Sequence, residues 1–468
     1  MGRALLFLLP LLSACDQDAP EPPANPRFGH YSTPQTAGLP PAALPGGATT
    51  YIPLTPGTNR SADAFSQPAA NLAPGLRAEF TIGNSFFSQA WVIAPASVSA
   101  RDGLGPLFNA AACQDCHLRD GRWHAPAAPG DALVGAVPRL ANSIGEADPH
   151  YGSQIQTRAV PDLAAEARVS VRWIESTVRL PDGTEFSLRR PDIQLSDWSE
   201  ESPAAGWRAA LRIAPPMIGL GLLEAIPAED LERHAAKTGA RLNRVPDRAS
   251  AGTTIGRFGW KAAQPNLRQQ SLTAFAEDIG ITSSLIPRDA CTGTQRDCRA
   301  QPHGGTPELS ARIEQAVVFY AGHLAPVARR DHARPDVIAG EALFREIGCA
   351  GCHQPDWMTD ESAVSPALAD QHIWPYTDLA LHDMGPDLAD GVEEFEAAGH
   401  DWRTPPLWGL GHTHTVSGEN AGFLHDGRAR STAEAILWHG GEAQAAREAW
   451  SSLPKSQRRQ VLRFLASL

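Results

Sequence analysis

Two short cysteine motifs constrain this chain more than any other feature. Each reads C-x-x-C-H, at residues 113–117 and 349–353. With 7 Cys and 16 His in 468 residues, chance would give roughly 0.004 such motifs. In this pattern the two thiols can add to the vinyl groups of a haem, while the imidazole takes one axial position on the iron. The motifs therefore predict two covalently attached c-type haems, with thioether bonds at Cys113, Cys116, Cys349 and Cys352 and axial ligands His117 and His353.

Two other uses of such cysteines fit less well. A zinc knuckle would need two further ligands close to each pair, and a thioredoxin-like dithiol has no use for the trailing His. Of the remaining cysteines, Cys291 and Cys298 lie seven residues apart in a polar loop. They predict a local disulfide in an oxidising compartment. No thiol would then be left for chemistry at an active site.

The first residues have the pattern of an export signal. An Arg at position 3 is followed by an apolar run at 4–12 that is too short to span a bilayer. We expect residues 1–14 to be a signal peptide. The end of this segment resembles a bacterial lipoprotein signal, which predicts a lipid anchor at Cys15 and a periplasmic, membrane-anchored protein. An ordinary signal peptide with a stray cysteine is the alternative.

The charge balance limits the partners. The net charge is −12 and the isoelectric point is near 5.7, so a nucleic-acid partner has no electrostatic support. A small cationic electron-donor protein would instead be attracted.

The periodicity predicts a mainly α fold of two cytochrome c-like haem domains. Apolar residues recur at helical spacing over 308–323, 339–347 and 454–468, and the last two segments flank the second haem motif. Alternation over 169–193 around Pro-Asp-Gly predicts a β-hairpin inserted in the first domain. The 41 Gly and 40 Pro predict much irregular loop.

Composition suggests where the domains divide. Residues 15–75 are rich in Pro and Ala and are expected to form a tether and lead-in. Residues 76–335 would form the first haem domain, and 336–468 the second. The Arg- and Pro-rich segment 324–335 is the predicted boundary.

The sixth ligand of each iron decides what the haem can do, because an open position lets a small molecule bind. At the second haem we favour His439, since Ser431 and Glu434 form a capping-box pattern that opens a helix ending at His439. The other candidates in this region are Met384, His382, His412, His414 and His425. At the first haem, His124 is close enough in sequence to compete, but the tight loop required favours a place at the pocket edge.

Three long segments resemble a known family. Residues 103–122, 256–283 and 402–440 are similar to the di-haem oxidoreductases, also labelled thiol oxidoreductases. These are relatives of the bacterial di-haem cytochrome c peroxidases and of the di-haem enzyme that matures methylamine dehydrogenase. The resemblance implies a peroxidase-like enzyme that reduces hydrogen peroxide at an open first haem, with electrons relayed through the second.

The same resemblance implies the residues around the open haem. Trp260 would lie between the haems, and Gln270, ten residues later, would orient the peroxide. Asp278 or Glu277 would shuttle a proton between the two peroxide oxygens. In the peroxidases a Met ligates the electron-transfer haem where His439 stands here, so a bis-His iron of lower potential is expected.

Alternatives remain open at this stage. One alternative is that the protein oxidises a side chain of a partner protein. The other is that both irons are closed and the protein is a purely electron-transferring cytochrome. Thiol oxidation, suggested by the family label, finds no reactive thiol. The resemblance also suggests a calcium ion between the two domains, but the sequence has no dense cluster of carboxylates that would support one.

Overall fold

The computed structural model describes residues 39–53, 61–123, 126, 133, 135–142 and 146–468. The predicted signal peptide, the lipid-anchor site Cys15 and the competing ligand His124 lie outside these residues. Within these ranges, every helix is too short or too polar to cross a lipid bilayer.

The prediction of a mainly α fold is wrong. Only 31% of the chain is helical and 18% is in strands. The described strands form antiparallel pairs, which are β1 (Leu107–Phe108) with β3 (Arg158–Ala159), β2 (Ala136–Ala141) with β6 (Arg208–Ile213), β4 (Arg168–Arg179) with β5 (Glu185–Ser196), β7 (Arg244–Asp247) with β8 (Gly252–Ile255), β9 (Trp357–Met358) with β10 (His372–Ile373), and β11 (Leu381–Asp383) with β12 (Asp401–Arg403). Most of these strand pairs are short, and the whole hairpin insertion separates β2 from β6 in the sequence. No local alternation of apolar and polar residues therefore predicts them.

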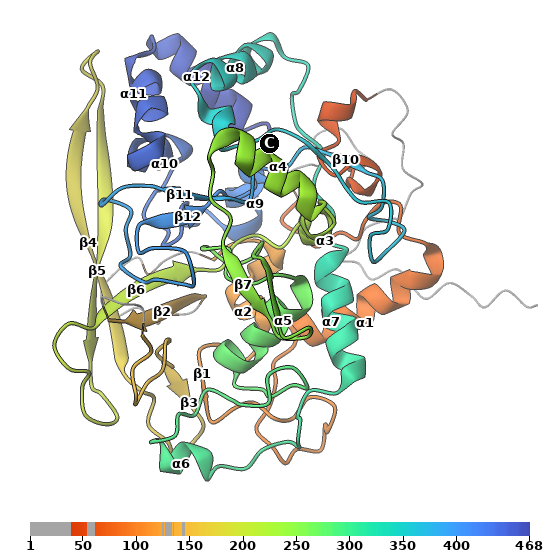
Figure 1. Ribbon diagram of the computed structural model, residues 1–468, viewed down its shortest axis with the longest axis vertical. Coiled ribbons are helices and arrows are strands. Elements are labelled where there is room, and N and C mark those ends of the chain that lie inside the picture. The colour runs from red at the N-terminus through yellow and green to blue at the C-terminus, as the bar shows by residue number, and fades with distance from the viewer. Residues whose placement is uncertain (1–38, 54–60, 124–125, 127–132, 134, 143–145) are drawn as a thin grey trace, which may run out of the picture.

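The predicted hairpin is confirmed as β4 and β5. Its strands pair from Arg168↔Ser196 to Arg179↔Glu185 around the Pro-Asp-Gly turn. The hairpin runs along one edge of the molecule, from the helices near the C-terminus down to β2 and β6 (Figure 1). At its tip Asp182 accepts a hydrogen bond from Arg458 at 2.6 Å. The insertion is thus attached to the C-terminal part of the chain.

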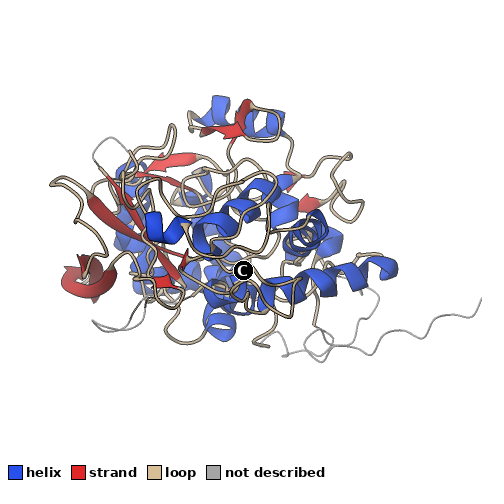
Figure 2. Cartoon of the chain, turned by 90° about the horizontal axis from the view of Figure 1, so that it is seen from below, coloured by secondary structure: helices blue, strands red, loops and turns tan. Residues whose placement is uncertain are grey.

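The helices lie in the body of the molecule with long loops around them (Figure 2). Those predicted over 308–323, 339–347 and 454–468 are confirmed as α7, α8 and α12. The described helices are α1 (Arg77–Ser88), α2 (Cys113–Cys116), α3 (Leu220–Glu224), α4 (Ala228–Thr238), α5 (Leu267–Ala274), α6 (Arg296–Arg299), α7 (Ala311–Gly322), α8 (Pro335–Glu346), α9 (Thr413–Ser417), α10 (Thr432–Trp438), α11 (Gln444–Ser452) and α12 (Lys455–Leu465).

Two helix pairs form the packing units nearest the haem motifs, α1 with α7 and α8 with α12 (Figure 1). Each crossing has a glycine where the backbones approach most closely. A Cβ at Gly83 would lie 2.1 Å from the carbonyl oxygen of Ala316, and one at Gly340 would lie 2.0 Å from that of Gln460. Only glycine permits this approach. The two pairs therefore place similar supports beside the two motifs.

The predicted disulfide is also confirmed. Cys291 and Cys298 are bonded across a separation of seven residues. The described cysteines that remain free are the four of the haem motifs.

Candidate haem-binding sites

The two C-x-x-C-H motifs have the same local architecture. Nδ1 of His117 donates a hydrogen bond to the carbonyl of Pro215 at 2.8 Å, and Nδ1 of His353 donates to Tyr376 at 3.0 Å. Because a carbonyl oxygen can only accept a hydrogen bond, Nδ1 of each ring must carry the proton. Nε2 of the neutral ring then has a lone pair that can bind a metal. Burial lowers the pKa of both imidazoles to about 4. Both histidines are therefore neutral, and each has an Nε2 available to a metal.

Each motif also has an aromatic ring supplied by its helix pair. Phe87 of α1 lies with its ring centroid 6.1 Å from that of His117, and Phe344 of α8 lies 6.1 Å from His353. A porphyrin needs a large apolar wall beside its axial imidazole. The helix pairs supply part of that wall at both motifs.

A large, mostly apolar cavity adjoins the second motif. Cys349, Cys352 and His353 are in its wall. Much of the remaining wall is apolar, including Phe344, Leu388, Trp402, Leu407, Leu410, Phe423, Leu424, Ile436, Val461 and Leu465. The apolar lining and the donor set suit a haem.

His439 lies in the wall of this cavity with His353. Ser431 caps the predicted helix, since its Oγ accepts from the Glu434 amide at 3.2 Å, but the Glu434 carboxylate accepts from the Arg430 amide at 3.0 Å and not from that of Ser431, so the reciprocal half of the predicted capping box is absent. At the other end of α10, His439 Nδ1 donates to the carbonyl of Ala435 at 2.7 Å. Burial lowers the pKa of His439. Its Nε2 is therefore available in the same way as that of His353.

His382 is in the same wall but has no nitrogen left for iron. Its Nε2 is 2.9 Å from Asp378 and its Nδ1 is 2.7 Å from Glu442. Burial would lower the pKa of His382, but the hydrogen bonds to Asp378 and Cys352 outweigh it and raise the pKa to about 11. His382 is thus a charged group held between two carboxylates.

Two of the other candidate ligands also reach this cavity, and two are not in its described wall. Met384 is in the wall. His425 is too, but its ring stacks face to face on Trp402 with centroids 3.8 Å apart. His412 and His414 are absent from the described lining. His439 and Met384 are therefore the two ligands that the geometry leaves.

Two buried arginines in the cavity wall lack a carboxylate partner. Arg122 is 7% exposed and donates to the carbonyls of Gly422 and Leu424 at 3.2 and 3.3 Å, while Arg403 is 6% exposed and donates to Gly259 at 2.9 Å. Neither forms an ion pair with any carboxylate that the structure describes. Burial lowers the pKa of both to about 10. An unpaired buried charge is costly, and the two propionates of a haem would compensate it.

Asp278, one of the residues that the resemblance implied, lies beside the first motif. Its backbone carbonyl accepts hydrogen bonds from the amides of Asn109 and Ala110, at 2.8 and 3.1 Å, just before the motif. Burial, and next the charge of Asp278, raise the pKa of Cys113 to about 12. Burial raises the pKa of Asp278 itself to about 6. A carboxyl that changes protonation near neutral pH therefore lies beside the first motif.

Glu277 points elsewhere. Its side chain is 43% exposed and forms an ion pair with Arg139 of β2 at 3.0 Å. Of the two acids that the sequence left open, the geometry favours Asp278 for a role at the first haem.

Trp260 is connected to both motifs, and Gln270 lies beside the neighbouring Gly259. Trp260 is in the wall of the second cavity, and its indole N–H donates to the carbonyl of Ile213 at 2.8 Å. Ile213 is two residues before Pro215, whose carbonyl holds His117. The buried Oε1 of Gln270 has no hydrogen-bond partner among the described residues and lies near Gly259. An unpaired buried amide of this kind suits a ligand that is not protein.

The sequence did not predict the helical turn that carries Glu277 and Asp278. Residues Phe275–Ile279 continue α5 as a π-helical turn. Such turns occur often at functional sites, yet no sequence period identifies them. Arg122 and Arg403 were missed as well, because a lone arginine gives no sign that it is buried.

No cluster of three or more His, Cys, Asp or Glu suited to a metal ion occurs in the described ranges. Several carboxylates instead pair with cations, as Asp390 and Glu394 do with Arg212. The calcium ion suggested by the resemblance therefore gains no support from a cluster of acidic side chains among the described residues.

Comparison with known proteins agrees with the motifs. The family described as "Di-haem oxidoreductase, putative peroxidase" matches residues 42–142 and 136–468. No curated protein matches the chain. Among solved structures, hydrazine synthase from Kuenenia stuttgartiensis, studied under 20 bar of xenon, is 12% identical, with 82% of this chain and 92% of that chain covered. Its TM-score of 0.34 is too low to support an argument. On the family match, which spans nearly all of the described residues, the chain belongs to the di-haem oxidoreductase family.

Proposed function

We propose that this protein is a c-type di-haem peroxidase that reduces hydrogen peroxide at the first haem with electrons relayed through the second. The supporting observation is the contrast between the two motifs. The second cavity has two imidazoles with an available Nε2, on His353 and His439. Beside the first motif lies the partly buried carboxyl of Asp278. This contrast supports a closed iron for electron transfer at the second motif and an open iron for peroxide at the first.

The haems would be bound by residues already described. Cys113 with Cys116, and Cys349 with Cys352, would form the thioether bonds, and Arg122 and Arg403 would hold the propionates of the second haem. When bound, the two haems supply the redox chemistry. Attachment of c-type haem outside the cytoplasmic membrane fits the proposed periplasmic location and the lipid anchor at Cys15.

The overall reaction consumes one hydrogen peroxide, two electrons and two protons and yields two waters. Asp278 would accept the proton of the near peroxide oxygen and return it to the far oxygen as the O–O bond breaks. The proton that Asp278 moves belongs to the peroxide itself, so both of the consumed protons come from solvent, and the electrons come from the donor protein. A pKa of about 6 for Asp278 suits a group that must both accept and release a proton. Gln270 would orient the peroxide through its unpaired amide.

The electrons would pass the region of Trp260. Its indole lines the second cavity and is tied to Ile213, on the segment that also fixes His117. These contacts with both motifs support a role for the ring as an electron carrier between the two haems.

A turnover measurement tests this function. The holoprotein is mixed with hydrogen peroxide and a reduced one-electron donor such as a small cationic cytochrome. We expect two donor molecules to be oxidised per peroxide, without release of oxygen. Donor that stays reduced while peroxide persists would contradict the proposal, and would leave a partner-protein oxidase or an electron carrier as the remaining functions.

A further inference from the structure

The turn that carries Asp278 is held at its C-terminal end by side chains of a distant segment. The last carbonyls of a helix have no partner within the helix. Here the carbonyl of Glu277 accepts hydrogen bonds from Nε2 of Gln154 at 3.0 Å and of Gln156 at 2.7 Å. Both glutamines are buried, at 6% and 3% exposure. The position of the turn is therefore set by these two amides.

Gln154 also contacts the carboxyl of Asp278 directly. Its Nε2 donates to Oδ1 of Asp278 at 2.8 Å. Arg139 donates to Oε1 of Gln154 at 3.2 Å, which fixes which end of the amide faces Asp278, because a guanidinium can only donate. One oxygen of Asp278 is thereby occupied, and no described residue donates to the other.

The backbone around Gln154 is held on both sides. Residues 153–155 pair with β2, since the amide of Leu140 donates to Ser153 and that of Ile155 donates to Pro138, both at 2.9 Å. This extends the β2–β6 pair toward the first motif. Gln154 has little freedom to leave Asp278.

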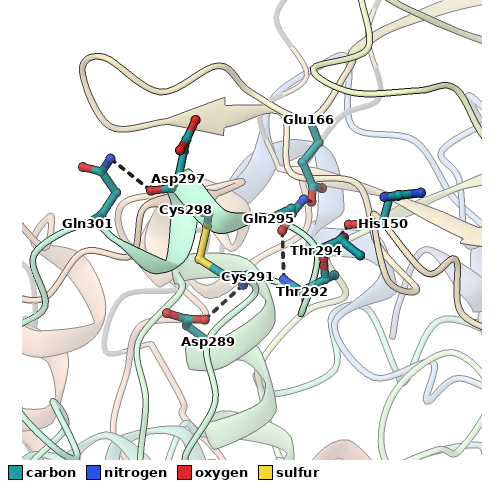
Figure 3. The surroundings of a disulfide bond; sticks show 10 residues. All are labelled: His150, Glu166, Asp289, Cys291, Thr292, Thr294, Gln295, Asp297, Cys298 and Gln301. Atoms are coloured by element: carbon teal, nitrogen blue, oxygen red, sulfur yellow. Dashed lines mark hydrogen bonds between the residues drawn. A yellow bond between two sulfur atoms is a disulfide. The ribbon is translucent and has the colours of Figure 1, made fainter.

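A buried acid anchors the far end of this segment. Glu166, 1% exposed, accepts from the amide of Gln156 at 2.6 Å and from the side chain of Gln295. Figure 3 shows Gln295 pointing from the loop closed by Cys291 and Cys298 toward Glu166. The disulfide loop thus supports the glutamines that hold the Asp278 turn.

We propose that Gln154 is the positioning residue for Asp278, directing its amide N–H to one carboxylate oxygen so that the other carries the transferred proton. The proposal rests on the proposed function, in which Asp278 acts on peroxide at the first haem. Gln154 touches neither haem nor substrate, and its effect passes through Asp278.

The direction of the effect follows from the hydrogen bond. A donor stabilises the ionised carboxylate, so its removal raises the pKa of Asp278 above about 6. The charged groups that face Asp278 are Glu277 on its own turn, which raises the pKa of Asp278, and Arg139 on β2, which lowers it. The thiols of the first motif are the other titratable groups beside it. Substitution of Gln154 leaves these ionisable groups in the chain, but it changes the hydrogen-bond partner of Arg139.

The test compares two variants of Gln154 with a control. Gln154→Met keeps the length of the side chain but cannot donate, and Gln154→Glu keeps an oxygen for Arg139 while adding a negative charge beside Asp278. The control, Gln67→Met, removes another buried glutamine, 5% exposed, that donates to the carbonyl of Asp63 at 2.8 Å. The rate of the spectral change on adding peroxide to the ferric holoprotein is measured across pH by stopped flow.

We expect the acid limb of this rate profile to move to higher pH by roughly one unit in Gln154→Met and further in Gln154→Glu. Gln67→Met should keep the native profile. If either Gln154 variant folds, binds haem and follows the native profile, the inference is overturned. If the native holoprotein itself does not react with peroxide, the proposed function fails instead, and the two failures are therefore distinguishable.

Discussion

Replacement of Asp278 by Asn is expected to lower the rate of reaction with hydrogen peroxide by roughly 100- to 10,000-fold, the usual contribution of a positioned acid–base group. The amide has the shape of the carboxyl and can still accept from Gln154, but it cannot take and return a proton. Stopped-flow spectra of the ferric holoprotein measure the rate. Haem content and the spectrum before peroxide should stay native.

Glu277→Gln is the matched control. Its side chain is more exposed and pairs with Arg139, so this variant should keep most of the native rate. A large loss in Glu277→Gln together with a native rate in Asp278→Asn would transfer the proton shuttle to Glu277.

The native enzyme should also show a defined pH dependence. Burial raises the pKa of Asp278 to about 6, and the ionised form is the one that accepts the proton from peroxide. The rate should therefore fall as pH drops through about 6. In Asp278→Asn this limb should disappear.

Replacement of His439 by Met is expected to raise the reduction potential of the second haem by on the order of 100 mV. This is a fraction of the range of roughly 0.8 V over which axial ligands set haem potentials. A thioether favours ferrous iron more than an imidazole does. Spectroelectrochemical titration of the holoprotein measures the potential. The first haem should keep its native potential, because His439 lies in the wall of the other cavity.

Met384→Leu is the companion variant, since Met384 is in the same wall. It should leave both potentials near their native values. If Met384→Leu changes the potential and spectrum of the second haem while His439→Met does not, Met384 is the ligand.

Features with a local cause were predictable from the sequence. The helix ending at His439 begins at the N-cap Ser431, which the sequence pattern identified. The hairpin turn at Asp182 and the disulfide between Cys291 and Cys298 depend on residues only a few positions apart. The division into two haem domains and the assignment of Trp260 and Gln270 remain predictions.

Features with a distant cause were not predictable. The contact between Gln154 and Asp278 joins residues 124 positions apart, and the pairing of β2 with β6 spans the hairpin insertion. The fold-class prediction failed for this reason, since short strands with distant partners leave little period-2 signal. The burial of Arg122 and Arg403 depends on a cavity assembled from many segments.

The most direct test of the central claim is an EPR and optical spectrum of the purified ferric holoprotein before and after hydrogen peroxide is added. An open first iron and a closed second iron predict one high-spin and one low-spin haem, with the high-spin signal lost on addition of peroxide. Two low-spin haems that do not respond to peroxide, even after partial reduction, would contradict the account and identify the protein as an electron carrier.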